Sequence, residues 1–246
     1  MSPGRGSPGT LNQTNMDKML GRFTPLRVLE LFAGSRSFGK VCDQNGIPVF
    51  SCDLEPYEGI DHVGDFRDMV FSDLPWVPTL IVAGVPCTSY SIAGIRYHRI
   101  EGRAISEAAH IGDQLVRKTL EWVDHFGCDY MIENPVGLLR HQPFMRDRPR
   151  RTIWYCRYGD HRAKPTDLWS NMFRDLTRPD GWEPRPQCYN GNQHCHHDKQ
   201  ARSYAKRKAL GQHQGGTQGA RDPYTRSIYP PAFVKSVIDH AQFKPR

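Results

Sequence analysis

The sequence predicts an α/β domain in which a parallel β-sheet carries helices on both faces. Short apolar runs that end in glycine or a polar tip alternate with helical segments, and this alternation is typical of parallel sheets. With 246 residues, 38% of them hydrophobic, the chain is long enough for one sizeable domain with a buried core. Strands are expected in the apolar runs 26–34, 47–56, 78–87, 128–135, 151–159 and 167–171.

Helical periodicity separates and follows these strands. Pro230 and Pro231 open the last helix, where proline is favoured, and five apolar residues follow at helical spacing. This apolar face is expected to dock on the sheet. The expected helices are 37–46, 104–126 and 229–241, the last with an apolar face of Phe233, Val234, Val237, Ile238 and Ala241.

Changes in composition divide the chain into four parts. Residues 1–25 are rich in Gly, Pro, Ser and Asn, which predicts a disordered tail. Residues 26–171 hold the alternating strands and helices. Residues 172–226 have many Gly, Pro, Arg, His and Gln and little periodicity, which predicts a small, loop-rich insert. Residues 227–246 contain the helix that packs back on the core.

Charge and cysteine usage narrow the class of protein. The net charge of +7 favours a polyanionic partner such as nucleic acid, although a merely soluble basic protein fits the charge equally well. The seven cysteines have no disulfide spacing, and no apolar run is suited to a signal peptide or a membrane span. A monomer with free thiols in a reducing, cytoplasmic compartment is expected, which excludes disulfide scaffolds and membrane proteins.

Polar residues stand where the predicted strands end. Because the carboxyl ends of parallel strands share one edge of the sheet, ligands bind there, and these residues together indicate a site. Each alone is compatible with an ordinary strand cap. The residues are Gly34, Asp53, Asp65, Cys87 and Glu133.

Three segments occur in an order that resembles the C5-specific DNA cytosine methyltransferases: "ELFAGSRSFGK" (30–40), "GVPCTSYS" (84–91) and "ENP" (133–135). The resemblance covers roughly 26–171, with a weaker similarity at 229–241. It implies a Rossmann-like methyltransferase sheet that uses S-adenosyl-L-methionine, with the loop-rich insert as the DNA-recognition part. It also implies double-stranded DNA as substrate, in a compact protein of a bacterium or of a phage-infected host cell.

The resemblance implies that Cys87 is the nucleophile. A thiolate that adds to C6 of a flipped cytosine makes C5 able to attack a methyl group on a sulfonium centre. Nearby cations are expected to lower the pKa of this thiol. Glu133 is expected to bind N3 and the exocyclic amine of the base. The alternative for Cys87 is a buried structural cysteine.

The same resemblance assigns a cofactor site. Gly34 lets the backbone approach the methionine part of S-adenosylmethionine, Asp53 binds the ribose hydroxyls and Asp65 contacts the adenine amine. Each carboxylate is alternatively a plain turn former. The cofactor-binding set is Phe32, Ala33, Gly34, Asp53, Asp65 and Pro86.

Basic residues are assigned to the base and to the nucleic acid backbone. Arg162 and Lys164 are expected to hold the cytosine O2 or a phosphate, or else to form a solvated face. The segment 91–103 follows the nucleophile, and a basic loop there is suited to close over a flipped nucleotide. Its nucleic-acid-binding residues are Arg96, Arg99 and Arg103.

Residues 188–197 of the insert suit zinc by type but not by spacing. No standard finger pattern is present, so we expect a polar, DNA-facing loop and no metal. Basic residues in 201–221 suit contacts with phosphates. The zinc-compatible residues are Cys188, His194, Cys195, His196 and His197.

Two other functions stay open. The short recognition window is compatible with another pyrimidine substrate, such as RNA or a nucleotide, or with a different one-carbon donor. Arg36 in the glycine loop is compatible with a nucleic-acid-binding protein without catalysis.

Overall fold

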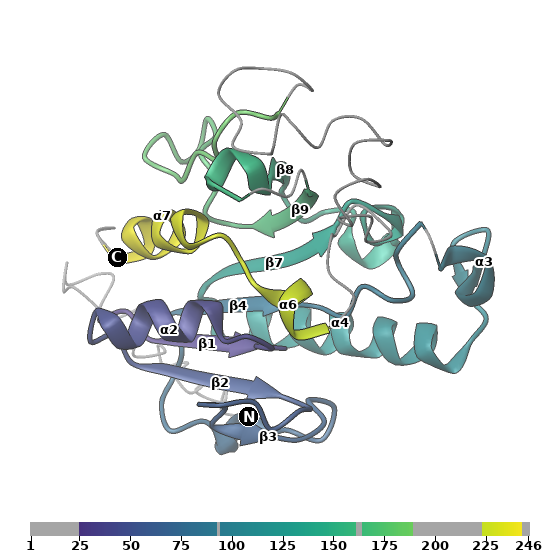
Figure 1. Ribbon diagram of the computed structural model, residues 1–246, viewed down its shortest axis with the longest axis horizontal. Helices are drawn as coiled ribbons and strands as arrows, with labels where there is room; N and C mark the ends of the chain where they lie inside the picture. Colours follow the sequence, from purple (N-terminus) through teal and green to yellow (C-terminus); the bar gives the residue numbers. More distant parts are fainter. Residues whose placement is uncertain (1–24, 93, 161–163, 189–222, 243–246) are drawn as a thin grey trace, which may run out of the picture.

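A seven-stranded β-sheet forms the centre of the protein (Figure 1). The computed structural model describes residues 25–92, 94–160, 164–188 and 223–242. The strand order is β3-β2-β1-β4-β7-β9-β8, and the first five of these strands are parallel. The strands are β1 Val28–Leu31, β2 Val49–Asp53, β3 His62–Val63, β4 Leu80–Gly84, β7 Asp129–Pro135, β8 Arg150–Trp154 and β9 Pro165–Ser170.

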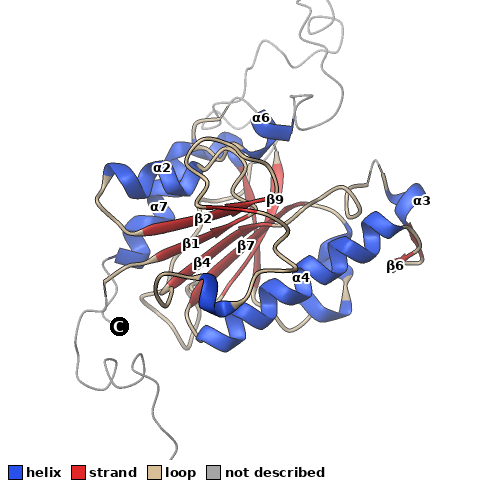
Figure 2. Cartoon of the chain, turned by 90° about the horizontal axis from the view of Figure 1, so that it is seen from below, coloured by secondary structure: helices blue, strands red, loops and turns tan. Residues whose placement is uncertain are grey.

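Helices cover both faces of the sheet, as Figure 2 shows. The helices α2 (Ser37–Gln44) and α7 (Pro231–Gln242) lie on one face, where Phe38 and Phe233 pack in the same apolar cluster. The helix α4 (Glu107–Phe126) lies on the other face. All five apolar residues predicted for the last helix are buried. The fold is therefore a Rossmann-like α/β fold.

Burial on both faces explains why the strands are continuous apolar runs. In β1, Leu29 and Leu31 belong to the core on the α4 side, whereas Val28 belongs to the core under α2 and α7. Parallel strands covered on both faces are expected to lack polar alternation. The one polar residue of β1, Glu30, is buried as well.

The sheet is not wholly parallel, which corrects the sequence-based expectation. The strand β9 runs antiparallel to both β7 and β8. Residues 155–164 join β8 to β9, and this connection is too short for the crossover that a parallel pair requires. The run predicted as one strand over 151–159 therefore ends at Trp154, and a 3₁₀ turn, η4 (Tyr155–Tyr158), follows.

Short elements complete the described chain. Ser106 caps α4 by accepting a hydrogen bond from the Ala109 N–H, and Gly127 ends the helix with a φ of 56°. No helix among the described residues has both the length and the apolarity to cross a membrane. The remaining elements are η1 Phe71–Asp73, α3 Ile95–His98, β5 Arg99–Ile100, β6 Arg103–Ala104, η2 Leu138–His141, η3 Pro143–Met145 and α6 Pro223–Ser227.

Glu30 holds the first turn of α2 against the sheet. Its carboxylate accepts hydrogen bonds from the Phe38 N–H at 3.0 Å, the Gly39 N–H at 2.9 Å and the Ser51 hydroxyl at 3.0 Å. Burial raises the pKa of Glu30 to about 7, and these hydrogen bonds oppose the rise. The carboxylate thus fixes the loop between β1 and α2, and burying its charge costs free energy.

We expect ionisation of Glu30 to lower stability as pH rises. Its pKa is about 7 in the folded chain against an ordinary 4.5, so the folded state binds more protons between these values and loses stability as pH rises through them. The full shift corresponds to about 3 kcal/mol. Urea unfolding should show this loss in the wild type relative to Glu30→Gln, whereas the exposed Glu121→Gln should keep the wild-type pH dependence. Equal pH dependence in wild type and Glu30→Gln would contradict the assignment.

Candidate active site

The loop after β1, residues 32–36, is called the glycine loop here. Phe32, Gly34 and Arg36 all have positive φ angles, of 56°, 50° and 57°. The Gly34 N–H donates to Asp53 Oδ2 at 2.7 Å, which ties the loop to the end of β2. A Cβ on Gly34 would lie 2.5 Å from the Ser227 Oγ, so this position requires glycine.

Arg36 points away from the end of the sheet. Its guanidinium pairs with Asp43 of α2 at 2.5 Å and donates to the Ser51 hydroxyl at 3.1 Å. The side chain also packs against Gly39 and Gly59. Arg36 therefore stabilises the glycine loop through its contacts with α2 and β2. It does not line the cavity described next.

A cavity of about 320 Å³ lies at the carboxyl ends of β1, β2, β4 and β7. This volume lies within the range of small-molecule sites. Seven of the residues predicted from the sequence line it: Phe32, Gly34, Asp53, Pro86, Cys87, Glu133 and Lys164.

Parallel pairing brings the thiol and the carboxylate together. In the register of β4 and β7, Gly84 lies opposite Glu133, and Cys87 follows three residues after Gly84. The Cys87 carbonyl accepts hydrogen bonds from the N–H groups of Tyr90 and Ser91, which closes a tight turn. Residues 46 positions apart in sequence therefore face the same cavity.

The electrostatics of Cys87 differ from the expectation. Burial raises the pKa of the thiol above its ordinary value, and the Glu133 carboxylate raises it further. Lys164 and Arg226 act in the opposite direction but do not reverse the shift. The cations that were expected to lower the pKa are present, yet desolvation outweighs them.

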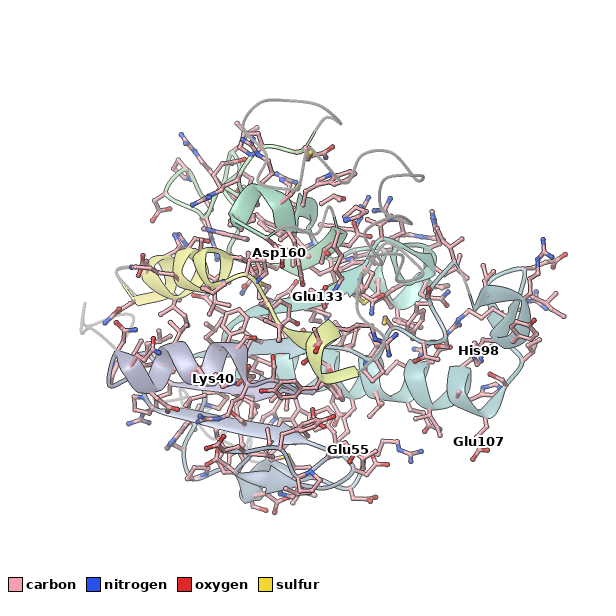
Figure 3. All side chains as sticks on the ribbon, in the orientation of Figure 1. Lys40, Glu55, His98, Glu107, Glu133 and Asp160 are labelled. Carbon is pink, nitrogen blue, oxygen red and sulfur yellow. The ribbon has the colours of Figure 1, made fainter. Side chains whose placement is uncertain are left out.

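Glu133 is held by donors on both oxygens. The Tyr155 hydroxyl donates to Oε1 at 3.2 Å and the Tyr229 hydroxyl to Oε2 at 3.3 Å. Lys164 Nζ lies 3.5 Å from Oε1 and 4.7 Å from the centre of the Tyr155 ring. Glu133 and Lys164 are 6% and 4% exposed. Figure 3 shows Glu133 near the middle of the molecule, beside the segment that joins α6 to α7.

Sequence reasoning missed the contribution of the C-terminal segment. Tyr224, Arg226, Ser227 and Tyr229 line the cavity, although this part was expected only to end the insert and begin a docking helix. Tyr155, from the turn after β8, was missed as well. The one sequence feature that could have indicated this contribution is Tyr229, which stands directly before Pro230. Its distance along the sequence from the strands has no pattern that predicts contact with them.

Two predicted cofactor residues do not line the cavity. Ala33 is a buried residue of the glycine loop, and its N–H donates to the Cys52 carbonyl. The Asp65 carboxylate pairs with Arg67 at 2.6 Å, and this hydrogen-bonded partner lowers the pKa of Asp65. Asp53 differs, because it lines the cavity and holds Gly34. Arg162 lies outside the described residues.

The basic segment after Cys87 divides into exposed and buried arginines. Arg96 and Arg103 are exposed. Arg99 is 3% exposed and pairs with Asp113 of α4 at 2.6 Å. Its Nε donates to the Ser89 carbonyl at 2.9 Å. Arg99 was expected to bind nucleic acid, but burial assigns it to anchoring the turn that contains Cys87.

The zinc-compatible cluster is only partly described. Cys188 is 5% exposed and packs with the buried Cys156 and with Trp154. His194 and the cysteine and histidines after it lie outside the described residues. Over the described part of the chain, no three His, Cys, Asp or Glu side chains are grouped as metal ligands.

Comparisons with known proteins leave the family open. No family model matches the chain, and no curated protein matches it in sequence. Solved structures that resemble it include the Entamoeba histolytica methyltransferase EhMeth, with 9% identity, a TM-score of 0.46 and coverage of 60% of this chain and 53% of that one. A mutant of Spodoptera frugiperda DNMT2 gives 10% identity, a TM-score of 0.41 and coverage of 63% and 53%. The chain thus spans about half the length of each.

We expect alkylation of Cys87 by iodoacetamide to accelerate with pH and to go on accelerating above the pH at which an ordinary cysteine is ionised, because burial raises the pKa of this thiol. Lys164→Met should slow alkylation at a fixed pH, since the lost cation raises the thiol pKa further. Glu133→Gln should accelerate it, since the lost carboxylate lowers that pKa. Mass spectrometry of the Cys87 peptide gives the rates. Effects of the same sign in both variants would contradict this electrostatic account.

Proposed function

We propose that this protein is an S-adenosylmethionine-dependent methyltransferase that acts on C5 of cytosine in DNA. One observation carries the proposal: the Cys87 thiol, the Glu133 carboxylate and the glycine loop all open into one cavity. A thiol beside a carboxylate suits addition to a pyrimidine ring, and a glycine loop at the end of β1 suits a nucleoside cofactor. The order of the sequence segments that resemble the cytosine methyltransferases supports the same reading.

The residues at the β1 and β2 end of the cavity fit S-adenosylmethionine. Gly34 presents backbone without a side chain, and Asp53 and Glu55 offer carboxylate oxygens for ribose hydroxyls. Phe32, Leu54 and Tyr57 offer apolar surface for a purine ring. When bound there, the cofactor would supply an electrophilic methyl group from its sulfonium sulfur, and the neutral thioether would be the leaving group.

The residues at the β4 and β7 end fit a cytosine. In the first step, a base takes the Cys87 thiol proton, the sulfur gives an electron pair to C6, and the C5–C6 π electrons become available at C5. Glu133 is placed to bind N3 and the exocyclic amine, which stabilises the ring as its charge changes. Lys164, fixed against Glu133, supplies a positive charge for the cytosine O2.

The reaction ends with elimination. After C5 has gained the methyl group, a base removes the C5 proton, the C5–C6 double bond forms again and the Cys87 thiolate leaves. The turn that holds Cys87 is anchored to α4 by Arg99 and Asp113, so the sulfur returns to the same position.

A nucleic acid substrate is supported by charge and by the segment after Cys87. The net charge is +7. Arg96 and Arg103 are exposed, and Tyr97 between them is 80% exposed. Basic and aromatic side chains together suit contact with phosphates and bases. Measuring methyl transfer to duplex DNA, RNA and dCMP in parallel separates the DNA proposal from the other pyrimidine substrates.

We expect Asp53→Ala to weaken S-adenosylmethionine binding by about 1–3 kcal/mol, because a buried hydrogen bond and the tie to Gly34 are both lost. Asp65→Ala should have the smaller effect, because Asp65 does not line the cavity and is paired with Arg67. Isothermal titration calorimetry measures both affinities. A larger loss for Asp65→Ala would place the cofactor elsewhere.

We expect duplex DNA with 5-fluorocytosine at the target to trap the enzyme. Fluorine cannot leave C5 as a cation, so the reaction stalls after thiol addition and methyl transfer with Cys87 joined to C6. A denaturation-resistant band on a gel should require both S-adenosylmethionine and Cys87, and peptide mapping should identify Cys87. Cys87→Ser should give no band, since a hydroxyl is far less ionised than a thiol. Methylation of ordinary DNA without trapping would exclude thiol addition.

A further inference from the structure

We propose that Tyr229 is a positioning residue that holds the Glu133 carboxylate and links it to the glycine loop. The inference rests on the proposed function, because it assigns Tyr229 a task in the same reaction. Tyr229 supplies no atom to the chemistry; it acts through Glu133.

The hydroxyl fixes one oxygen of Glu133. Tyr229 donates to Oε2 at 3.3 Å, while Tyr155 donates to Oε1 at 3.2 Å. Lys164 approaches Oε1 as well, so within the described part of the chain Tyr229 is the donor on Oε2. Burial raises the pKa of Tyr229 well above its ordinary value, and the Glu133 charge adds to this. The phenol therefore stays protonated and remains a donor.

The backbone of the same segment fixes the glycine loop. The Tyr229 N–H donates to Ser37 Oγ at 3.1 Å, and the Ser35 and Ser37 hydroxyls are 2.9 Å apart. Two residues earlier, Ser227 Oγ accepts from the Ser35 N–H at 2.8 Å. One short segment thus contacts the loop for the cofactor and the carboxylate for the base.

The ring leaves the hydroxyl little freedom. It packs against Phe38 and Phe233, with ring centres 5.6 Å and 6.0 Å away. A Cβ on Gly84 would lie 2.5 Å from the Tyr229 hydroxyl, so the last residue of β4 must be glycine to accommodate it. A displacement of the glycine loop is therefore passed to Glu133 through a rigid phenol.

Tyr229→Phe tests the proposal, because it keeps the ring and the backbone N–H and removes only the hydroxyl. We expect S-adenosylmethionine affinity to stay within about twofold of wild type and the rate of methyl transfer to DNA to fall about fivefold to tenfold, the effect of one lost hydrogen bond. Tyr130→Phe removes a buried phenol that does not line the cavity and should change neither. Equal rates in Tyr229→Phe and wild type would overturn the proposal.

A double-mutant cycle with Glu133→Gln separates positioning from a general structural role. If Tyr229 acts through Glu133, Tyr229→Phe should cause no further loss in the Glu133→Gln background. Independent losses that multiply would show that Tyr229 acts by another route. Melting temperatures of all four proteins check that each is folded.

A second cycle needs no methyl transfer, so its outcome does not depend on the proposed function. The alkylation rate of Cys87 reports the Glu133 charge beside the thiol. Tyr229→Phe should change this rate by at least about twofold when Glu133 is present and leave it unchanged in Glu133→Gln. A change of equal size in both backgrounds would refute the link between Tyr229 and Glu133. Absence of methyl transfer to any pyrimidine substrate, with this coupling intact, would refute the proposed function alone.

Discussion

The position of β4 between β1 and β7 is the constraint on which the site depends. Leu31 of β1 pairs with Ala83, and Gly84 pairs with Glu133 of β7. Because all three strands are parallel, the loop after β1, the turn after β4 and the end of β7 meet at one edge. The helices on the two faces bury the strands and keep that edge in place.

Two carboxylates then give this edge a defined shape, one of them buried and the other half-buried. Glu30 holds the first turn of α2, and Asp53 holds the Gly34 N–H, so both sides of the glycine loop are fixed by charge-assisted hydrogen bonds. The loop accommodates a positive φ at Phe32 and Arg36, which costs free energy that these anchors offset. The conformation of the glycine loop thus depends on Glu30 and Asp53 as much as on Gly34.

The same burial that shapes the cavity keeps the Cys87 thiol protonated. Desolvation raises the pKa of Cys87, and the neighbouring Glu133 adds to the effect. Lys164, Tyr155 and Tyr229 surround the carboxylate and satisfy both of its oxygens. In the proposed reaction, a bound cytosine has to compete for these contacts, so the reactivity of the site depends on what enters the cavity.

The sequence by itself determined six of the seven strands of the central sheet, the three longest described helices and most of the polar tips at one edge, because apolar runs and helical periodicity are local properties. It brought Cys87, Glu133 and Asp53 into one predicted site, and the structure places all three around one cavity. Only the tertiary structure decided that Arg99 is buried against Asp113 and that Tyr229 reaches Glu133. Pairs this far apart in the chain have no periodicity to connect them, and their contact depends on how the sheet and its helices pack.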